Sequence, residues 1–364
     1  MTPLEQLAIK HEILDLLYQR ARGADRFDVP LMRACHPLDA TDNHGTYQGL
    51  MHGFLDKLEQ SMRTGPTCLS KEHVLANALF DFRPDGDVFA ETYHVAHERF
   101  EEASGFVDYR IGGRYLDIFR RVEGRWLIQH RNIVYDWSRT LTNAPLQAEE
   151  QPDALIGSRT GSDPLYSACP SARGRLVAAP PSLSSGDITL DQALQRLLDK
   201  QEIAEVLYRR ARAGDRGDAE LAHSCYHPGA TERHGIFDGL AAEFVDVVSW
   251  TRPDKPGSPI KTMLHVISNI LCDFSNNDEA FVESYHVAYC HMNDGTDSVI
   301  GGRYLDRFAR RNGRWAIVHR DVIFDWSRKE PETEKFWAKH PAAEFLYGKR
   351  GTEDPLYAYV ERGK

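Results

Sequence analysis

The chain has 364 residues, with 44 lysines and arginines against 54 aspartates and glutamates, which gives a formal charge of −10. Domains usually contain about 100–200 residues, so this length predicts two of them. The acidic balance argues against a nucleic-acid partner, because phosphate binding needs a basic face. No apolar run reaches the roughly 20 residues of a membrane helix, and the first residues lack the apolar core of a signal peptide.

Six cysteines are scattered along the chain without a CxxC pair or a metal-ligand spacing. The sequence also lacks HExxH and GxSxG motifs, so it predicts no metal site, no cofactor and no serine nucleophile. Reduced thiols together with the missing export signal predict a cytoplasmic protein.

The sequence repeats itself once. The string YQRARGADRFD from Tyr18 recurs as YRRARAGDRGD from Tyr208, and the GGRYLD…HR…YDWSR stretch from Gly112 recurs from Gly301 as GGRYLD…HR…FDWSR. DPLY follows each copy. A period this long marks a duplicated domain, because solenoid repeats are much shorter. We therefore expect a first domain over 1–167, a linker over 168–186 that is rich in Pro, Ser, Ala and Gly, and a second domain over 187–364.

Within each copy, helices come before strands. Residues 4–22 have apolar side chains at helical spacing, and a shorter helical stretch follows Gly49 and, in the second copy, Gly239. Four β-like runs follow at 73–82, 88–99, 106–121 and 125–137, joined by tight turns. Helices gathered before an antiparallel sheet predict an α+β fold. A curved sheet around a long helix leaves a concave interior suited to a small molecule.

Four motifs occur in both copies: the helix ending ADRFD or GDRGD, the HG that follows CHP or CYHP, the GGRYLD strand, and RW…HR…DW. They resemble the SnoaL-like branch of the nuclear transport factor 2-like superfamily, the α+β cone of scytalone dehydratase, ketosteroid isomerase and polyketide cyclases. The resemblance implies two tandem cone-shaped α+β barrels. The superfamily also holds hydrolases, oxygenase subunits and plain binding proteins, so fold does not fix function.

In the dehydratase-like members, a helix-borne Asp faces a sheet-borne His inside the cone. The matching positions here are Asp25 with His73, and Asp215 with His265. Many relatives carry a tyrosine five residues before the Asp, where this chain has an arginine. Its helix tyrosines lie seven residues before the Asp, on the same helix face, and could look into the same cavity. The four residues concerned are Arg20, Arg210, Tyr18 and Tyr208.

An Asp that accepts the Nδ1–H of a His raises the basicity of the ring and leaves Nε2 free to move a proton. Phenols or an arginine would stabilise the enolate or phenolate that develops. We therefore expect a cofactor-independent lyase acting on a hydroxylated, largely apolar, aromatic or polycyclic molecule. Both loss of water and retro-aldol loss of formaldehyde from a phenolic diol fit these groups. The further substrate-binding candidates are Asn77, Asn269, Tyr93 and Tyr285.

Some assignments remain open. Tyr93 and His94 are neighbours on a strand, so only one can face inward, and the interpretation favours the tyrosine, as it does for Tyr285 beside His286. His44 precedes a glycine and is expected to serve a turn. The alternatives for the whole chain are a non-catalytic small subunit of a ring-hydroxylating oxygenase, a binding protein, or an isomerase or cyclase. A homodimer or homotrimer is expected, and if only one copy works the sequence favours the second.

Overall fold

The computed structural model describes residues 1–44, 46–64, 67–102, 105–142, 155–169, 189–249 and 259–331. The first domain begins with helices α1 (Pro3–Asp25) and α2 (Val29–Ala34), continues through the short strands β1 (Thr41–Asn43) and β2 (Gln48–Leu50), and then forms α3 (Met51–Thr64). Four long strands follow, β3 (Thr67–Phe82), β4 (Val88–Glu102), β5 (Gly105–Val122) and β6 (Arg125–Thr142). They pair antiparallel in the sheet order β2-β1-β6-β5-β4-β3, with β1 parallel to β6.

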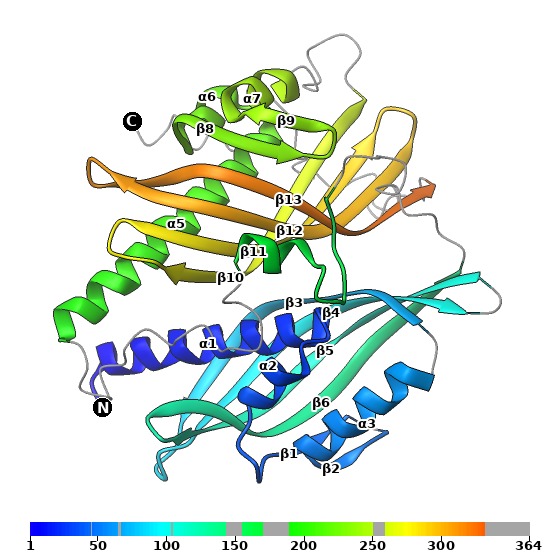
Figure 1. Cartoon of the computed structure of the whole chain (residues 1–364), viewed down its shortest axis with the longest axis vertical. Helices are drawn as coiled ribbons and strands as arrows, with labels where there is room; N and C mark the ends of the chain where they lie inside the picture. Colours follow the sequence, from blue (N-terminus) through cyan, green and yellow to red (C-terminus); the bar gives the residue numbers. More distant parts are fainter. Residues whose placement is uncertain are drawn as a thin grey trace, which may run out of the picture.

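The second domain repeats this order. It contains α5 (Leu190–Arg216), α6 (Ala219–Ser224), β8 (Tyr226–His234), β9 (Phe237–Leu240), α7 (Ala241–Ser249), β10 (Ile260–Phe274), β11 (Glu279–Met292), β12 (Thr296–Arg311) and β13 (Arg314–Pro331). Its sheet order is β10-β11-β12-β13-β8-β9. In Figure 1 each sheet curves beside its own long helix, with the first domain below the second. The predicted pair of α+β cones is confirmed.

Each long helix begins at a capping box and packs one face on its sheet. Thr2 and Glu5 cap α1 reciprocally, and Thr189 and Gln192 do the same for α5. These contacts satisfy backbone N–H groups that have no partner within the helix. The apolar stripe predicted for α1 forms the first core together with side chains of β3, β5 and β6, although Leu7 near its start is 43% exposed.

Residues 155–169 connect the two domains. Strand β7 (Leu155–Ile156) pairs in parallel with β13, and α4 (Pro164–Ala168) buries Leu165 against Leu305 and Ile323 of the second sheet. The end of the predicted first domain therefore packs on the second one. Most of the predicted linker, from residue 170 on, lies outside the described residues, as does everything after 331. The boundary at 167 stays a prediction.

The two domains contact each other through different surfaces. The end of α1 and strand β3 of the first domain lie on the outer face of the second sheet, where Val74 packs against Val287, Val299 and Trp326. The equivalent of Val74 in the second domain, Val266, is 40% exposed. Such a contact is heterologous, because equivalent residues of the two copies have different surroundings.

Candidate active site

The predicted pair of the first domain is in contact. Asp25 is the last residue of α1 and is fully buried; its Oδ1 lies 2.5 Å from Nδ1 of His73 on β3. The backbone N–H of His73 donates to Oδ2 at 3.0 Å. Burial opposes the charged carboxylate, but His73 and Arg26 outweigh it and lower the pKa of Asp25. The pair is thus held as a carboxylate that orients an imidazole.

The second domain repeats this geometry. Asp215 near the end of α5 accepts from His265 at 2.6 Å to Nδ1 and 3.1 Å to the backbone N–H. One contact differs between the copies. Tyr285 of the second domain donates its hydroxyl to Asp25 at 2.9 Å, whereas Tyr93, its counterpart in the first domain, is 42% exposed. Both predicted Asp–His contacts are confirmed, but only the first has this additional donor among the described residues.

A cavity lies beside the first pair. It encloses about 800 Å³, part of which is open to solvent, and His73 lies in its wall. Its apolar lining comes from helices and strands of the first domain, namely Leu17, Met32, Phe54, Leu58, Ile111 and Ile133. Because Nδ1 of His73 is occupied by Asp25, Nε2 is the ring nitrogen available to a ligand.

His94, and not Tyr93, faces this cavity, which corrects the expected orientation of β4. The ring of His94 stacks on Tyr115 at 4.1 Å, and the guanidinium of Arg131 lies 4.0 Å from the ring centre of Tyr115. Arg131 in turn forms two hydrogen bonds of 2.7–2.8 Å to Asp117. Burial raises the pKa of Tyr115, so its hydroxyl stays protonated.

The second domain builds the same stack. His286 lies 4.2 Å from Tyr304, Arg320 covers the tyrosine at 3.9 Å, and Arg320 pairs with Asp306. Burial lowers the pKa of His286 well below its usual value, and the nearby Arg320 and Arg303 act in the same direction. Strand alternation alone left the choice between tyrosine and histidine undecided, since both alternating sets contain apolar residues. The three-dimensional packing shows that in both copies the histidine, and not the tyrosine before it, stacks on a tyrosine of the next strand.

A second histidine–carboxylate pair was missed in the sequence. His44 was expected to serve a turn, but it lines the cavity, donates from Nδ1 to the carboxylate of Asp42 and stacks on Phe54 at 4.2 Å. Burial lowers the pKa of His44, although Asp42 opposes this effect. The equivalent residues His234 and Glu232 lie 3.1 Å apart. The HG motif, which occurs in both copies, was the sequence signal from which this histidine–carboxylate pair could have been predicted.

Several other predicted site residues lie elsewhere. The stripe of α1 that faces the cavity contains Leu17, Arg20, Ala21 and Ala24; Tyr18 is turned about 100° from Leu17 and packs in the first core. Tyr208 is 50% exposed on α5. The helix tyrosines therefore do not line the cavity, whereas Arg20 does. Arg20 donates from Nε to Nε2 of His36 at 3.0 Å, and burial lowers its pKa.

The predicted asparagines and the second arginine have other surroundings as well. Asn77 is exposed. Asn269 is buried and bridges the domains, accepting from the backbone N–H of Leu75 and donating to the carbonyl of His73, both at 2.8 Å. It thus fixes the strand that carries His73 without entering the cavity. Arg210 donates to Tyr226 at 2.8 Å and lies 3.8 Å from Glu232.

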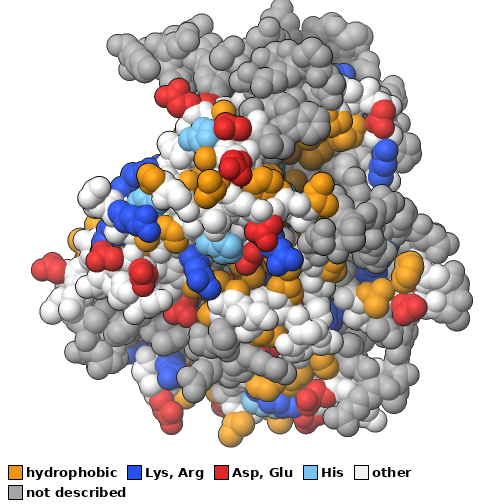
Figure 2. All heavy atoms as spheres, turned by 45° about the horizontal axis from the view of Figure 1, so that its top comes forward, with side chains coloured by type: hydrophobic (Ala, Val, Ile, Leu, Met, Phe, Trp, Pro, Cys, Tyr) orange, Lys and Arg blue, Asp and Glu red, His pale blue; other side chains and the backbone are white. Residues whose placement is uncertain are grey.

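Within the described residues there is no cluster of three His, Cys, Asp or Glu side chains that could hold a metal ion. None of the described helices is long and apolar enough to cross a membrane. All six cysteines are free and buried. Acidic, basic and hydrophobic side chains are interspersed over the face drawn in Figure 2, and its described part shows no large patch of one charge.

The chain was compared with solved structures, with curated proteins and with protein families. Solved structures with a similar fold include a protein from Novosphingobium aromaticivorans that is provisionally called a scytalone dehydratase, with 17% identity over 39% of this chain and 97% of that one and a TM-score of 0.34. Hexachlorocyclohexane dehydrochlorinase LinA-type3 from Novosphingobium barchaimii shows 18% identity, the same coverage and a TM-score of 0.34. A comparison with curated proteins gives no match. The SnoaL-like domain matches residues 5–132 and 195–321. The chain therefore belongs to the SnoaL-like domain family and carries two copies of that domain.

Proposed function

We propose that the chain is a lyase that uses His73, oriented by Asp25, as a general base and then as a general acid. The observation that carries the proposal is the Asp25–His73 contact, which places His73 in the wall of a partly open cavity. A carboxylate on Nδ1 stabilises the imidazolium that forms when Nε2 accepts a proton. Loss of a small neutral molecule from the substrate needs this proton transfer and its return.

The proton balance is simple for both reactions that fit. In a dehydration, Nε2 removes the acidic C–H proton, the C–O bond breaks with its electron pair on oxygen, and the imidazolium returns the proton to release water. In loss of formaldehyde, Nε2 removes the proton of a primary hydroxyl, the C–C bond breaks, and the resulting carbanion takes the proton back. Tyr115, which stays protonated, and Arg20 lie in the same cavity as donors for a developing oxyanion.

The cavity lining supports the substrate class. Aliphatic and aromatic side chains alternate with histidines and arginines, which suits a flat apolar ring that carries hydroxyl groups. The buried free thiols fit a reducing compartment, and we place the enzyme in the cytoplasm as part of the same proposal.

The test compares His73→Gln, His265→Gln and the double variant in the full-length chain. Substrates are a panel of β-hydroxy aryl ketones, which report loss of water, and phenolic diols, which report formaldehyde. Loss of the general base is expected to lower turnover by about 10²- to 10⁴-fold, with circular dichroism and thermal unfolding unchanged. Unaltered turnover in the double variant would remove both histidines from the mechanism. Tight binding of a panel member with no product over hours would instead identify a binding protein.

A further inference from the structure

Arg159 enters the first cavity from the segment between the domains. It lies three residues after β7 and is only 8% exposed. Its side chain forms part of the cavity wall together with His73, and its guanidinium carbon is 5.7 Å from the centre of the Phe27 ring. This arginine was not singled out in the sequence, because it follows the strands of the first repeat and belongs to none of the recurring strand motifs.

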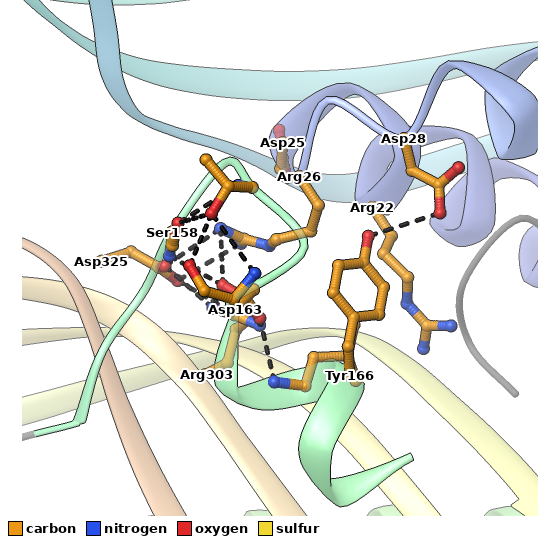
Figure 3. A network of polar contacts seen from close by, with 12 residues as sticks. Arg22, Asp25, Arg26, Asp28, Ser158, Asp163, Tyr166, Arg303 and Asp325 are labelled. Atoms are coloured by element: carbon orange, nitrogen blue, oxygen red, sulfur yellow. Dashed lines mark hydrogen bonds and ion pairs between the residues drawn. The ribbon is translucent and has the colours of Figure 1, made fainter. Parts of the chain in front are cut away.

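The second domain holds this segment in place. Gly157 donates its N–H to the carbonyl of Phe324 at 2.8 Å, and a Cβ at Gly157 would come within 1.6 Å of an oxygen of Asp325. Asp163 forms hydrogen bonds of 2.8 and 2.9 Å to Arg303, and the N–H of Ser158 donates to Asp163 at 2.7 Å. Figure 3 shows this network, with Asp163 between Arg303 and Arg26. Arg159 is therefore anchored by residues on both sides.

The guanidinium of Arg159 is buried without a complete set of partners. Its Nε and Nη1 have no hydrogen-bond partner among the described residues. A buried donor that lacks an acceptor is unfavourable, and more so when it carries charge. Glu98 is the carboxylate that shares the cavity wall with Arg159, and it is paired with Lys71 at 2.6 Å. The arginine thus has donors to offer to a ligand.

The other arginines of the cavity wall differ from Arg159 in their partners. Arg20 donates to the imidazole of His36, which stays neutral because burial lowers the pKa of that imidazole well below its usual value. Arg131 is balanced by Asp117. Arg20 also lies near the buried carboxylate of Asp42, so Arg159 is the cation of the wall with donors that have no partner among the described residues.

We propose that Arg159 binds a carboxylate of the substrate, so that the first site is specific for an anionic, hydroxylated aromatic compound. The inference rests on the proposed function for the reaction, but not for the binding. The unpartnered Nε and Nη1 lie on different edges of the guanidinium, and each can donate one charge-assisted hydrogen bond to a carboxylate oxygen. The second copy has Met263 and Cys290 where the first has Lys71 and Glu98, so its cavity wall offers a different charge pattern.

The experiment is isothermal titration of the full-length chain with 4-hydroxybenzoate and with its neutral counterpart 4-hydroxybenzamide. The wild type is expected to bind the acid about 10- to 100-fold more tightly than the amide, as one charge-assisted contact would give. Arg159→Gln is expected to abolish that preference, and Arg159→Lys to retain part of it. Arg125→Gln, which changes an exposed arginine at the start of β6, is the matched control and should leave both affinities unchanged.

Thermal unfolding of each variant separates a binding effect from a folding defect, and Arg159→Lys keeps the test available if the glutamine variant is unstable. Equal affinity of the wild type for acid and amide would overturn the proposal, as would a preference that survives Arg159→Gln. Because binding is measured without turnover, this failure is distinct from that of the lyase assignment, which depends on His73.

Discussion

Tyr285 of the second domain donates a hydrogen bond of 2.9 Å to Asp25 of the first, across 260 residues of sequence. Both groups are buried, so the bond is shielded from water. Burial raises the pKa of Tyr285 well above its usual value, and the phenol therefore stays a donor. The duplicated domain thus completes the carboxylate that orients His73.

Removing this donor should affect catalysis more than folding. We expect Tyr285→Phe to lower turnover about 10- to 150-fold, because a hydrogen bond to a charged group contributes roughly 1.5–3 kcal/mol. The acidic limb of the pH–rate profile should also move, since Asp25 loses a partner that favours its charged form. Steady-state kinetics from pH 5 to 9 would measure both effects.

Tyr93→Phe is the matched control, because Tyr93 is the counterpart of Tyr285 in the repeat and is largely exposed. It should change neither turnover nor the pH profile. If Tyr285→Phe and Tyr93→Phe behave alike, Tyr285 does not act through Asp25.

The Arg131–Asp117 pair should be important for stability. Both side chains are buried, and Arg131 also covers Tyr115. Asp117→Asn leaves the buried guanidinium without a counter-charge, which is expected to lower the free energy of unfolding by about 3–5 kcal/mol. Urea denaturation would measure this. Lys329→Gln, which removes an exposed ion pair with Asp294, should leave the free energy of unfolding nearly unchanged, because water screens that pair. Similar losses in both variants would contradict the assignment.

Gly157→Ala should release the segment that carries Arg159. The added Cβ would overlap Asp325, which also binds Arg26 and Arg303. We expect faster proteolysis within 155–169 and a weaker preference for carboxylate ligands. Gly214→Ala is the control, because its nearest neighbour would be Arg210 Nη1 at an ordinary 3.5 Å. Unchanged proteolysis of the Gly157 variant would show that the segment tolerates the methyl group.

Glu12 on α1 should make stability depend on pH. Burial raises its pKa from 4.5 to about 7, although Arg121 and Lys200 oppose the shift. Between these values the folded chain keeps a proton that the unfolded chain has lost, so the free energy of unfolding falls as pH rises. Relative to wild type, Glu12→Gln should therefore gain stability above pH 7, by at most about 3 kcal/mol, and gain nothing at pH 4.

Urea denaturation at pH 4, 6 and 8 would test this prediction, with Glu123→Gln in the exposed β5–β6 turn as the control. The Glu123 variant should follow wild type at every pH. A difference between the Glu12 variant and wild type that is equal at pH 4 and pH 8 would exclude titration of Glu12 as its cause.

The contact of Asp25 with His73 could be expected from the sequence, because the family resemblance places one on the helix and the other on the sheet of the same cone. The orientation of β4 could not. Tyr93 and His94 alternate on a strand whose two faces are both partly covered: His94 faces the cavity, and His97, on the face of Tyr93, stacks on Trp326 of the second domain. The prediction that Tyr18 lines the cavity was wrong for a related reason. Tyr18 and Asp25 share a face of the helix, but that face does not border the same cavity along its whole length.

The sequence by itself determined the duplication and the α+β class, because these depend on local periodicity and on motifs that recur in each copy. The Asp–His pairs followed from the resemblance of those motifs to the SnoaL-like branch. Only the tertiary structure decided how the two domains contact each other and which residues of one domain reach the site of the other. Two nearly equivalent domains meet through non-equivalent surfaces, so Tyr285, Asn269 and Arg159 serve the first site while Tyr93 and Asn77 are exposed. Contacts between residues so far apart in the chain leave no local pattern from which they could be predicted.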